Sequence, residues 1–292
     1  MPFTPTMPAF QRAEASAMRS ADDAQPNSIA RLVTQAQRGA GAWTWPLVMC
    51  CVRLPILVSC FLVSLLIAQG LGNVEATNLA EGLTRFDLPI VADVLCLALL
   101  WRLTRREGMR LRDLLCWSRK HLLRDFALGI GLFMFAYVAL FALEAGVAIA
   151  TTSGSAQQAQ AMQRLLASGA INPLGMGWQI GMSALLLPIT TAVTEELVYR
   201  GYAQARLTAL TGHPWLAVII TSLGFAAQHL AYGLTSAQGA LAAVVGAGVA
   251  GALFGALYYL TRQRLVALIL IHWQSNVISL GLAPILLTLL VR

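Results

Sequence analysis

The chain has 292 residues, of which 58% are hydrophobic and 11% are charged, and it carries a formal net charge of +7. Soluble domains carry roughly 25% charged residues, so this composition excludes an ordinary soluble globular protein. It predicts an all-α fold, a polytopic transmembrane helical bundle. The positive charge lies between apolar segments and forms no basic stripe with interleaved aromatic residues, which argues against nucleic acid as a partner and favours anionic membrane lipid.

A polar stretch opens the chain and a series of apolar runs follows. Residues 1–42 are rich in Ala, Gln, Arg, Ser and Pro, which predicts a disordered cytoplasmic tail ahead of one membrane-embedded domain over residues 43–292. A hydrocarbon core of about 30 Å needs a helix of roughly 20 residues. The apolar runs that meet or approach this length are 54–74, 88–101, 126–143, 174–194, 207–261 and 265–291.

The lengths of these runs set the number of crossings. Run 207–261 is long enough for two crossings, with a turn expected at 233–239. Run 265–291 is long for one crossing and short for two. The weaker run 88–101 contains Asp93 and supplies the second crossing. The sequence therefore predicts seven or eight transmembrane helices.

Loop charges predict the orientation, because Lys and Arg gather on the cytoplasmic side of a membrane. Segment 102–125 holds eight basic residues against three acidic ones, and the tail holds four arginines, so both are predicted to be cytoplasmic. Segments 69–87 and 151–173 hold one basic residue each and are predicted to be external. The helix over 174–194 then runs inward and ends near the cytoplasmic face.

An acid pair is the most informative feature of the second half. From Thr151 to Arg292 the chain contains two carboxylates, Glu195 and Glu196, at the end of run 174–194. An ionised carboxylate at membrane depth costs at least ~2.5 kcal/mol, so it must be paired, hydrated or functional. Residues four apart share a helix face, which predicts a Glu196–Arg200 pair, whereas Glu195 points about 100° away and keeps its charge uncommitted. Glu195 is the predicted general base, although the pair alone is equally compatible with a charge cluster at the headgroup level.

Two histidines in separate apolar runs favour the catalytic interpretation. Phe225 lies one turn before His229 and can fix its imidazole by packing. His272 and Asn276 are four apart, so one helix presents an imidazole and a carboxamide side by side, which suits an oxyanion donor set or a metal ligand with its orienting partner. Each histidine alone is more often a packed polar residue, but three helices that each bury a catalytic-type side chain predict a hydrolytic centre.

These residues fall into three spaced motifs that resemble a known family. EExxxR is present as Glu195, Glu196 and Arg200, FxxxH as Phe225 and His229, and HxxxN as His272 and Asn276. In this order the motifs resemble those of the type II CAAX prenyl endopeptidases and their bacterial relatives, the CPBP or Abi intramembrane proteases. The resemblance covers about residues 170–280, and the first half of the chain matches only in hydropathy.

The resemblance implies an intramembrane endopeptidase that acts on a peptide or a prenylated protein. Glu195 and His229 would activate a water, His272 and Asn276 would stabilise the oxyanion, and Glu196, Arg200 and Phe225 would support the site. Residues 43–292 would then form the protease domain.

The sequence leaves the metal requirement open. Glu195, His229 and His272 are enough in number to hold zinc, since catalytic zinc sites use three protein ligands and an open position. The HExxH spacing of many zinc proteases is missing, and the family's site also fits a metal-free, glutamate-dependent mechanism.

Two other classes of function stay open on the sequence. A proton-coupled carrier could use a buried glutamate with two histidines as a relay, although no internal repeat is visible. A non-catalytic immunity or scaffold protein could share the fold. A single lysine and an arginine-rich loop are typical of a GC-rich bacterial source and predict an inner-membrane protein whose N-terminus and active site face the cytoplasm.

Overall fold

The structure is a computed structural model that describes residues 42–72, 76–77, 80, 83, 88–116, 121–134, 186–232, 234 and 237–278. Within these ranges every regular element is helical. The predicted tail, the predicted external segment 151–173 and the end of the last run, 279–291, lie outside them. The labelled elements are α3 (Thr44–Cys51), α4 (Arg53–Gly70), α6 (Pro89–Arg106), α7 (Leu111–Leu114), α11 (Leu187–Glu195), η3 (Glu196–Gln204), α12 (Ala205–Thr211), α13 (Pro214–Gln228), η4 (His229–Tyr232), α14 (Ala237–Leu260) and α15 (Leu265–Asn276).

Three helical stretches in the described part are long and apolar enough to cross a membrane: Thr44–Gly70, Pro214–Tyr232 and Ala240–Leu260. The last two confirm that run 207–261 holds two long apolar helices. Most of the predicted turn 233–239 lies outside the described residues, and α14 already begins at Ala237. Helix α6 forms over the predicted run 88–101 but carries Asp93 and three arginines at its far end. The total of seven or eight crossings stays a prediction.

The first apolar helix begins earlier than predicted. The sequence placed its start at residue 54, with Arg53 as a flanking charge, but helical residues begin at Thr44. Pro55 has no backbone N–H and its ring crowds the carbonyl four residues earlier, which accounts for the short break between α3 and α4 at Val52. Arg53 therefore lies inside a hydrophobic helix and is 1% exposed.

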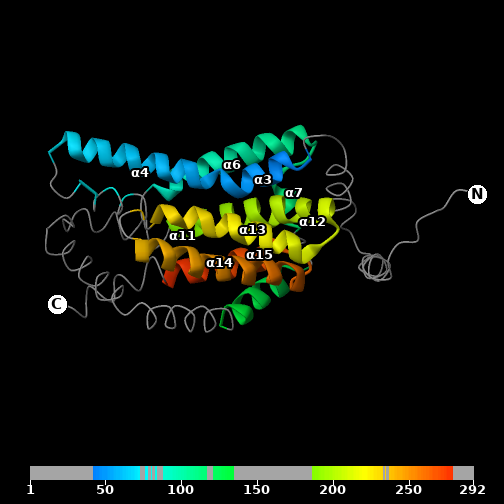
Figure 1. Cartoon of the computed structure of the whole chain (residues 1–292). Helices are drawn as coiled ribbons and strands as arrows, with labels where there is room; N and C mark the ends of the chain where they lie inside the picture. The colour runs from blue at the N-terminus through cyan, green and yellow to red at the C-terminus, as the bar shows by residue number, and fades with distance from the viewer. Residues whose placement is uncertain are drawn as a thin grey trace, which may run out of the picture.

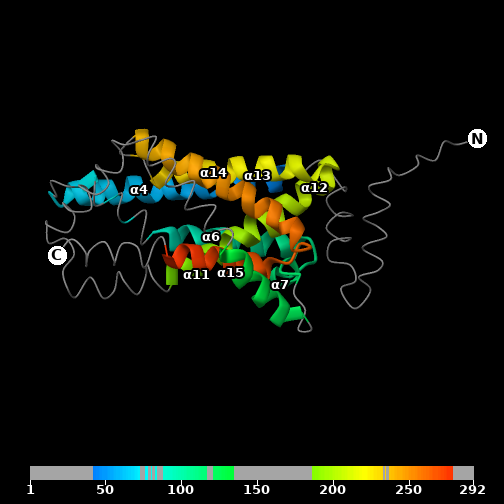
Figure 2. The same ribbon diagram turned by 90° about the horizontal axis from the view of Figure 1, so that it is seen from below.

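The long helices run side by side along one direction, as both ribbon views show (Figures 1 and 2). Helix α13 packs along α14, α11 packs against both α6 and α15, and α3 contacts η3. Seen from below in Figure 2, α4, α13 and α14 form one layer, and α6, α11 and α15 form the other.

Two glycines allow the close approaches on which the site depends. A Cβ at Gly224 on α13 would lie 2.7 Å from the backbone oxygen of Cys50, so only glycine lets the first helix come this close. A Cβ at Gly251 on α14 would lie 3.2 Å from Cα of Ser222. These contacts place α3 and α14 directly against α13, which carries part of the site.

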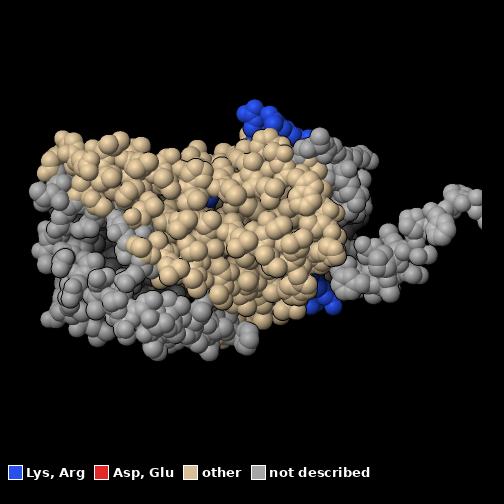
Figure 3. Space-filling view, viewed as in Figure 1, with Lys and Arg blue, Asp and Glu red and all other residues tan. Residues whose placement is uncertain are grey.

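One end of the bundle is basic. Figure 3 shows basic side chains in two separate patches, at the upper and lower edges of one half of the face, and a small basic spot near its centre. Exposed arginines follow the end of α6 and the α14–α15 turn: Arg102, Arg105, Arg106, Arg110, Arg112 and Arg262. These two segments meet where the amide of Leu265 donates to the carbonyl of Leu115, at 3.3 Å. The cytoplasmic location of this end stays a prediction.

The helix that carries the acid pair does not end there. The sequence predicted that Glu195 closes a span near the cytoplasmic face, but α11, η3 and α12 continue one another from Leu187 to Thr211. Arg206, further along this stretch, pairs with Glu107 at the end of α6. Glu195 is eleven residues before Arg206 and therefore lies on the order of 15 Å deeper in the bundle. The prediction that the helix ends at the acid pair is therefore wrong.

Candidate active site

Glu195 is a buried carboxylate held by three helices other than its own. Its side chain forms an ion pair with Arg53 of α4 through Oε1. Nε2 of Gln228, the last residue of α13, donates to the same Oε1 at 2.7 Å. Oε2 faces Nε2 of His272 on α15 at 3.3 Å. The prediction that Glu195 stays uncommitted is wrong, because its partners come from segments remote in sequence.

Glu196 makes the local pair that helical spacing predicted. Its Oε1 lies 3.1 Å from Nη1 of Arg200, and both residues are at most 1% exposed. The same Oε1 lies 2.8 Å from Nδ1 of His272. Arg200 also donates through Nη2 to the carbonyl of Gly251 at 3.1 Å. Arg200 therefore ties the second carboxylate to α14.

His272 contacts both carboxylates, which the predicted rotation of about 100° between them did not anticipate. The backbone changes from α-helix to π-helix at the junction of Glu195 and Glu196. A π-helix closes its turns with i→i+5 hydrogen bonds, so each residue advances less around the axis, and such segments often mark functional sites. The two neighbouring side chains can then reach the same imidazole.

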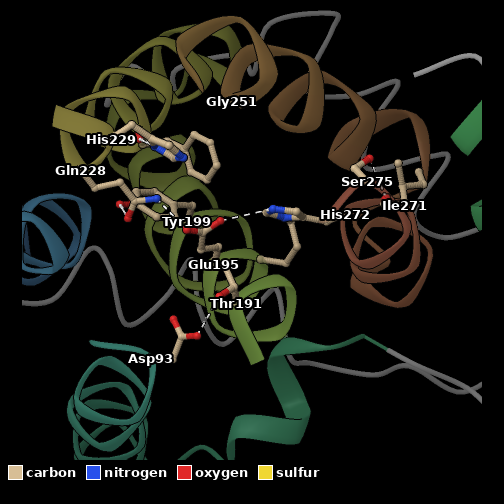
Figure 4. A network of polar contacts seen from close by, with 12 residues as sticks. Asp93, Thr191, Glu195, Tyr199, Gln228, His229, Gly251, Ile271, His272 and Ser275 are labelled. Atoms are coloured by element: carbon tan, nitrogen blue, oxygen red, sulfur yellow. Dashed lines mark hydrogen bonds and ion pairs between the residues drawn. The ribbon is translucent and has the colours of Figure 1, made fainter. Parts of the chain in front are cut away.

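His229 begins the short 3₁₀ turn η4, directly after α13 ends. Its Nδ1 lies 2.8 Å from the carbonyl of Phe225, so a proton on Nδ1 leaves the lone pair on Nε2. The rings of Phe225 and His229 have centroids 4.9 Å apart, which confirms the predicted packing. In the view of Figure 4, His229 lies above Glu195 and His272 lies to its right, joined to it by a dashed line.

Phe225 joins the parts of the site. Its ring lies 4.9 Å from the guanidinium carbon of Arg200 and 6.2 Å, centroid to centroid, from His272. Phe254 stacks on His272 at 5.0 Å. The aromatic rings exclude water from the buried ion pairs and limit the rotation of the imidazole.

Asn276 ends α15, one turn after His272. Its Nδ2 is buried and has no hydrogen-bond partner among the residues that the structure describes. A buried amide donor without a partner costs roughly 1–3 kcal/mol, and such groups in folded proteins call for an explanation.

Sequence reasoning missed several members of the site. Arg53 and Asp93 are 1% exposed and pair at 2.7 Å, and Oγ1 of Thr191 donates to Asp93 at 3.0 Å (Figure 4). Tyr199 donates to Oε1 of Gln228 at 2.9 Å, which leaves the amide of Gln228 to face Glu195. The rule that a buried charge in an apolar run must be paired or functional was applied to Glu195, and it would have singled out Arg53 and Asp93 as well.

The sequence left open whether Glu195, His229 and His272 hold zinc. No group of three His, Cys, Asp or Glu side chains comes together in the described part of the chain in an arrangement that could hold a metal ion. Glu195 is instead paired with a cation, and both nitrogens of His272 face carboxylates. As arranged in the described residues, this donor set does not fit zinc.

Residues 177–278 match the family model of the type II CAAX prenyl endopeptidase Rce1-like proteins. No curated protein and no solved structure shows a significant match. The matched segment contains all three motifs, and it places this part of the chain in the CAAX protease-like family that the motifs indicated. Together with the apolar helices, the match indicates an integral membrane protein, and the matched model describes a family of endopeptidases.

Proposed function

We propose that this protein is an intramembrane endopeptidase of the CAAX prenyl protease-like class, which hydrolyses a peptide bond with a water activated by Glu195 and His229. The observation that carries the proposal is the environment of Glu195. A carboxylate that is 2% exposed has one oxygen fixed by two donors and the other turned toward His272. This arrangement suits a base that must be ionised, oriented and shielded from bulk water.

The two oxygens of Glu195 have different tasks in this mechanism. Oε1 is occupied by Arg53 and Gln228, so it sets the orientation. Oε2 takes the proton from the attacking water, and Nε2 of His229 accepts the other hydrogen bond of that water. The water oxygen bonds to the carbonyl carbon, and Glu195 returns the proton to the leaving amine as the C–N bond breaks.

The α15 helix supplies the donors for the negative charge that develops on the carbonyl oxygen. Nδ2 of Asn276 is buried without a partner in the described residues, and it donates to this oxygen. His272 is the second donor when its Nε2 carries a proton. Its contact with Glu195 at 3.3 Å is longer than its contact with Glu196 at 2.8 Å, so Glu196 holds the ring while Nε2 turns to the substrate.

The family resemblance favours a prenylated CAAX peptide as the test substrate. Purified protein in detergent or in liposomes is incubated with this peptide, and mass spectrometry detects the released C-terminal tripeptide. Wild type is expected to release it and Glu195→Gln to release none, at equal expression and with the same thermal unfolding. Parallel reactions with EDTA and with 1,10-phenanthroline are expected to proceed at the wild-type rate. Cleavage by Glu195→Gln at the wild-type rate would overturn the proposal, and loss of cleavage with both chelators would overturn its metal-free form.

A further inference from the structure

A closed network of polar contacts links the first half of the chain to one turn of α11. Thr191 donates to Asp93 on α6 at 3.0 Å, Asp93 accepts from Nη2 of Arg53 on α4 at 2.7 Å, and Arg53 pairs with Glu195. Thr191 and Glu195 are four residues apart on the same helix. The network therefore starts and ends on the helix face that carries the proposed base.

Burial of the Arg53 side chain carries a high cost in desolvation free energy. It is the single charge of the 27-residue candidate span Thr44–Gly70 and is 1% exposed. A buried ion pair is weak evidence for stability, because desolvation can cancel the attraction and apolar residues of similar volume often serve as well. Charges inside membrane segments mark functional sites more often than structural ones.

The geometry of Arg53 is that of a side chain which orients another. Nη1 pairs with Oε1 of Glu195 and lies 3.4 Å from Oε1 of Gln228, while Nη2 is held by Asp93. The planar guanidinium cannot turn toward one partner without leaving another. Asp93 thus fixes Arg53, and Arg53 fixes one oxygen of Glu195 and the amide that donates to it.

We infer that Arg53, anchored by Asp93, is a positioning residue that holds the carboxylate of Glu195 with Oε2 toward the attacking water. The inference rests on the proposed function and extends the site beyond residues 177–278, because α4 and α6 supply both residues. The first half of the chain then completes the active site.

The main test is the double variant R53Q/D93N. It removes one positive and one negative charge, so the net charge of Arg53, Asp93 and Glu195 together is unchanged. We expect a folded protein with a lower melting temperature than wild type, because the buried carboxylate of Glu195 loses its cationic partner. Its kcat is expected to be lower by roughly 10–100-fold, as for other residues that orient a reactive group, and its KM to stay within about twofold of wild type. R53K, which keeps the charge but not the planar fork, is expected to recover part of the lost kcat.

The matched control is R206Q/E107Q. This pair is also largely buried and joins the same two parts of the fold, but Glu107 lies fourteen residues after Asp93, about 20 Å further along α6. Its kcat is expected to equal that of wild type. An unchanged kcat in folded R53Q/D93N, or an equal loss in R206Q/E107Q, overturns the inference.

Two further measurements keep the outcome decisive. If R53Q/D93N does not fold, the single variant D93N replaces it in the test. D93N keeps the Arg53–Glu195 pair but removes the carboxylate that anchors Arg53. Its kcat is expected to fall by about 3–10-fold, and a wild-type kcat overturns the inference.

The infrared carboxylate band of Glu195, identified by its disappearance in E195Q, is expected to shift in R53Q/D93N. This band tests the positioning without turnover, so an enzyme that cleaves no peptide refutes the proposed function, whereas an unshifted band refutes the role of Arg53.

Discussion

Nδ1 of His272 lies 2.8 Å from Oε1 of Glu196, while Nε2 of the same ring lies 3.3 Å from Oε2 of Glu195. One imidazole thus connects two carboxylates that are neighbours in the chain but differ in their partners. Glu195 is paired with a cation from the first half of the protein, and Glu196 with Arg200 one turn away on its own helix. The two acids should therefore respond differently to the same substitution.

Substitution of Glu195 by Gln should have a large effect on kcat and a smaller effect on thermal stability. The amide keeps the shape of the side chain but cannot accept the proton of the water, and loss of a general base lowers kcat by roughly 10²–10⁴-fold. Arg53 still has Asp93 as a partner, so no buried cation is left without a carboxylate. Peptide-cleavage kinetics and thermal unfolding measured on the same preparation check both halves of this prediction.

Substitution of Glu196 by Gln should lower thermal stability more than it lowers activity. Among the described residues no second carboxylate pairs with Arg200, which is 1% exposed and would keep only the carbonyl of Gly251 and the neighbouring rings. A buried charge that loses its partner destabilises a protein by about 3–5 kcal/mol. Thermal unfolding of E196Q and E195Q side by side is the measurement. Equal melting temperatures would show that Arg200 does not depend on this pair.

Substitution of Asn276 by Ala should lower kcat and leave stability unchanged or slightly improved. The buried Nδ2 has no partner in the described part of the chain, so its removal breaks no hydrogen bond seen there. Loss of one oxyanion donor lowers kcat by roughly 10²–10³-fold. Asn276→Asp is the matched variant, because it has nearly the same size but places a negative charge against the oxyanion. An alanine variant with wild-type kcat would remove Asn276 from the mechanism.

Contacts within one helical turn were predictable from the sequence. The pair of Glu196 with Arg200 and the packing of Phe225 on His229 follow from the four-residue spacing, and both are present. The prediction for Glu195 failed because its partners Arg53 and Gln228 belong to other helices. Spacing along a helix indicates which side chains share a face but not which distant segment packs against that face.

The end of the helix that carries the acid pair was misplaced for a related reason. The sequence placed the end of the helix where the apolar run ends, at Glu195, yet the helix continues through residues that are polar but buried. Tyr199, Arg200 and Gln204 find partners on α13 and α14, so this polar stretch remains inside the bundle. Hydropathy measures how well a side chain is accommodated in lipid. Polar side chains that are covered by other helices do not contact lipid, so the helix can continue through them.

The close packing of α14 on α13 gives a further prediction with an internal control on one helix. A Cβ at Gly251 would lie 3.2 Å from Cα of Ser222 and 3.3 Å from the ring of Phe225, whereas a Cβ at Gly246 would meet no atom within 4 Å. Gly251→Ala should therefore push the helices apart, lower stability by about 1–3 kcal/mol and disturb the Phe225 ring that packs on His229. Gly246→Ala should be neutral or more stable by up to ~1 kcal/mol, because alanine favours the helix. Thermal unfolding and cleavage rates of the two variants decide the matter, and a Gly251→Ala protein as stable and active as Gly246→Ala would mean that the α13–α14 contact does not hold the second motif in place.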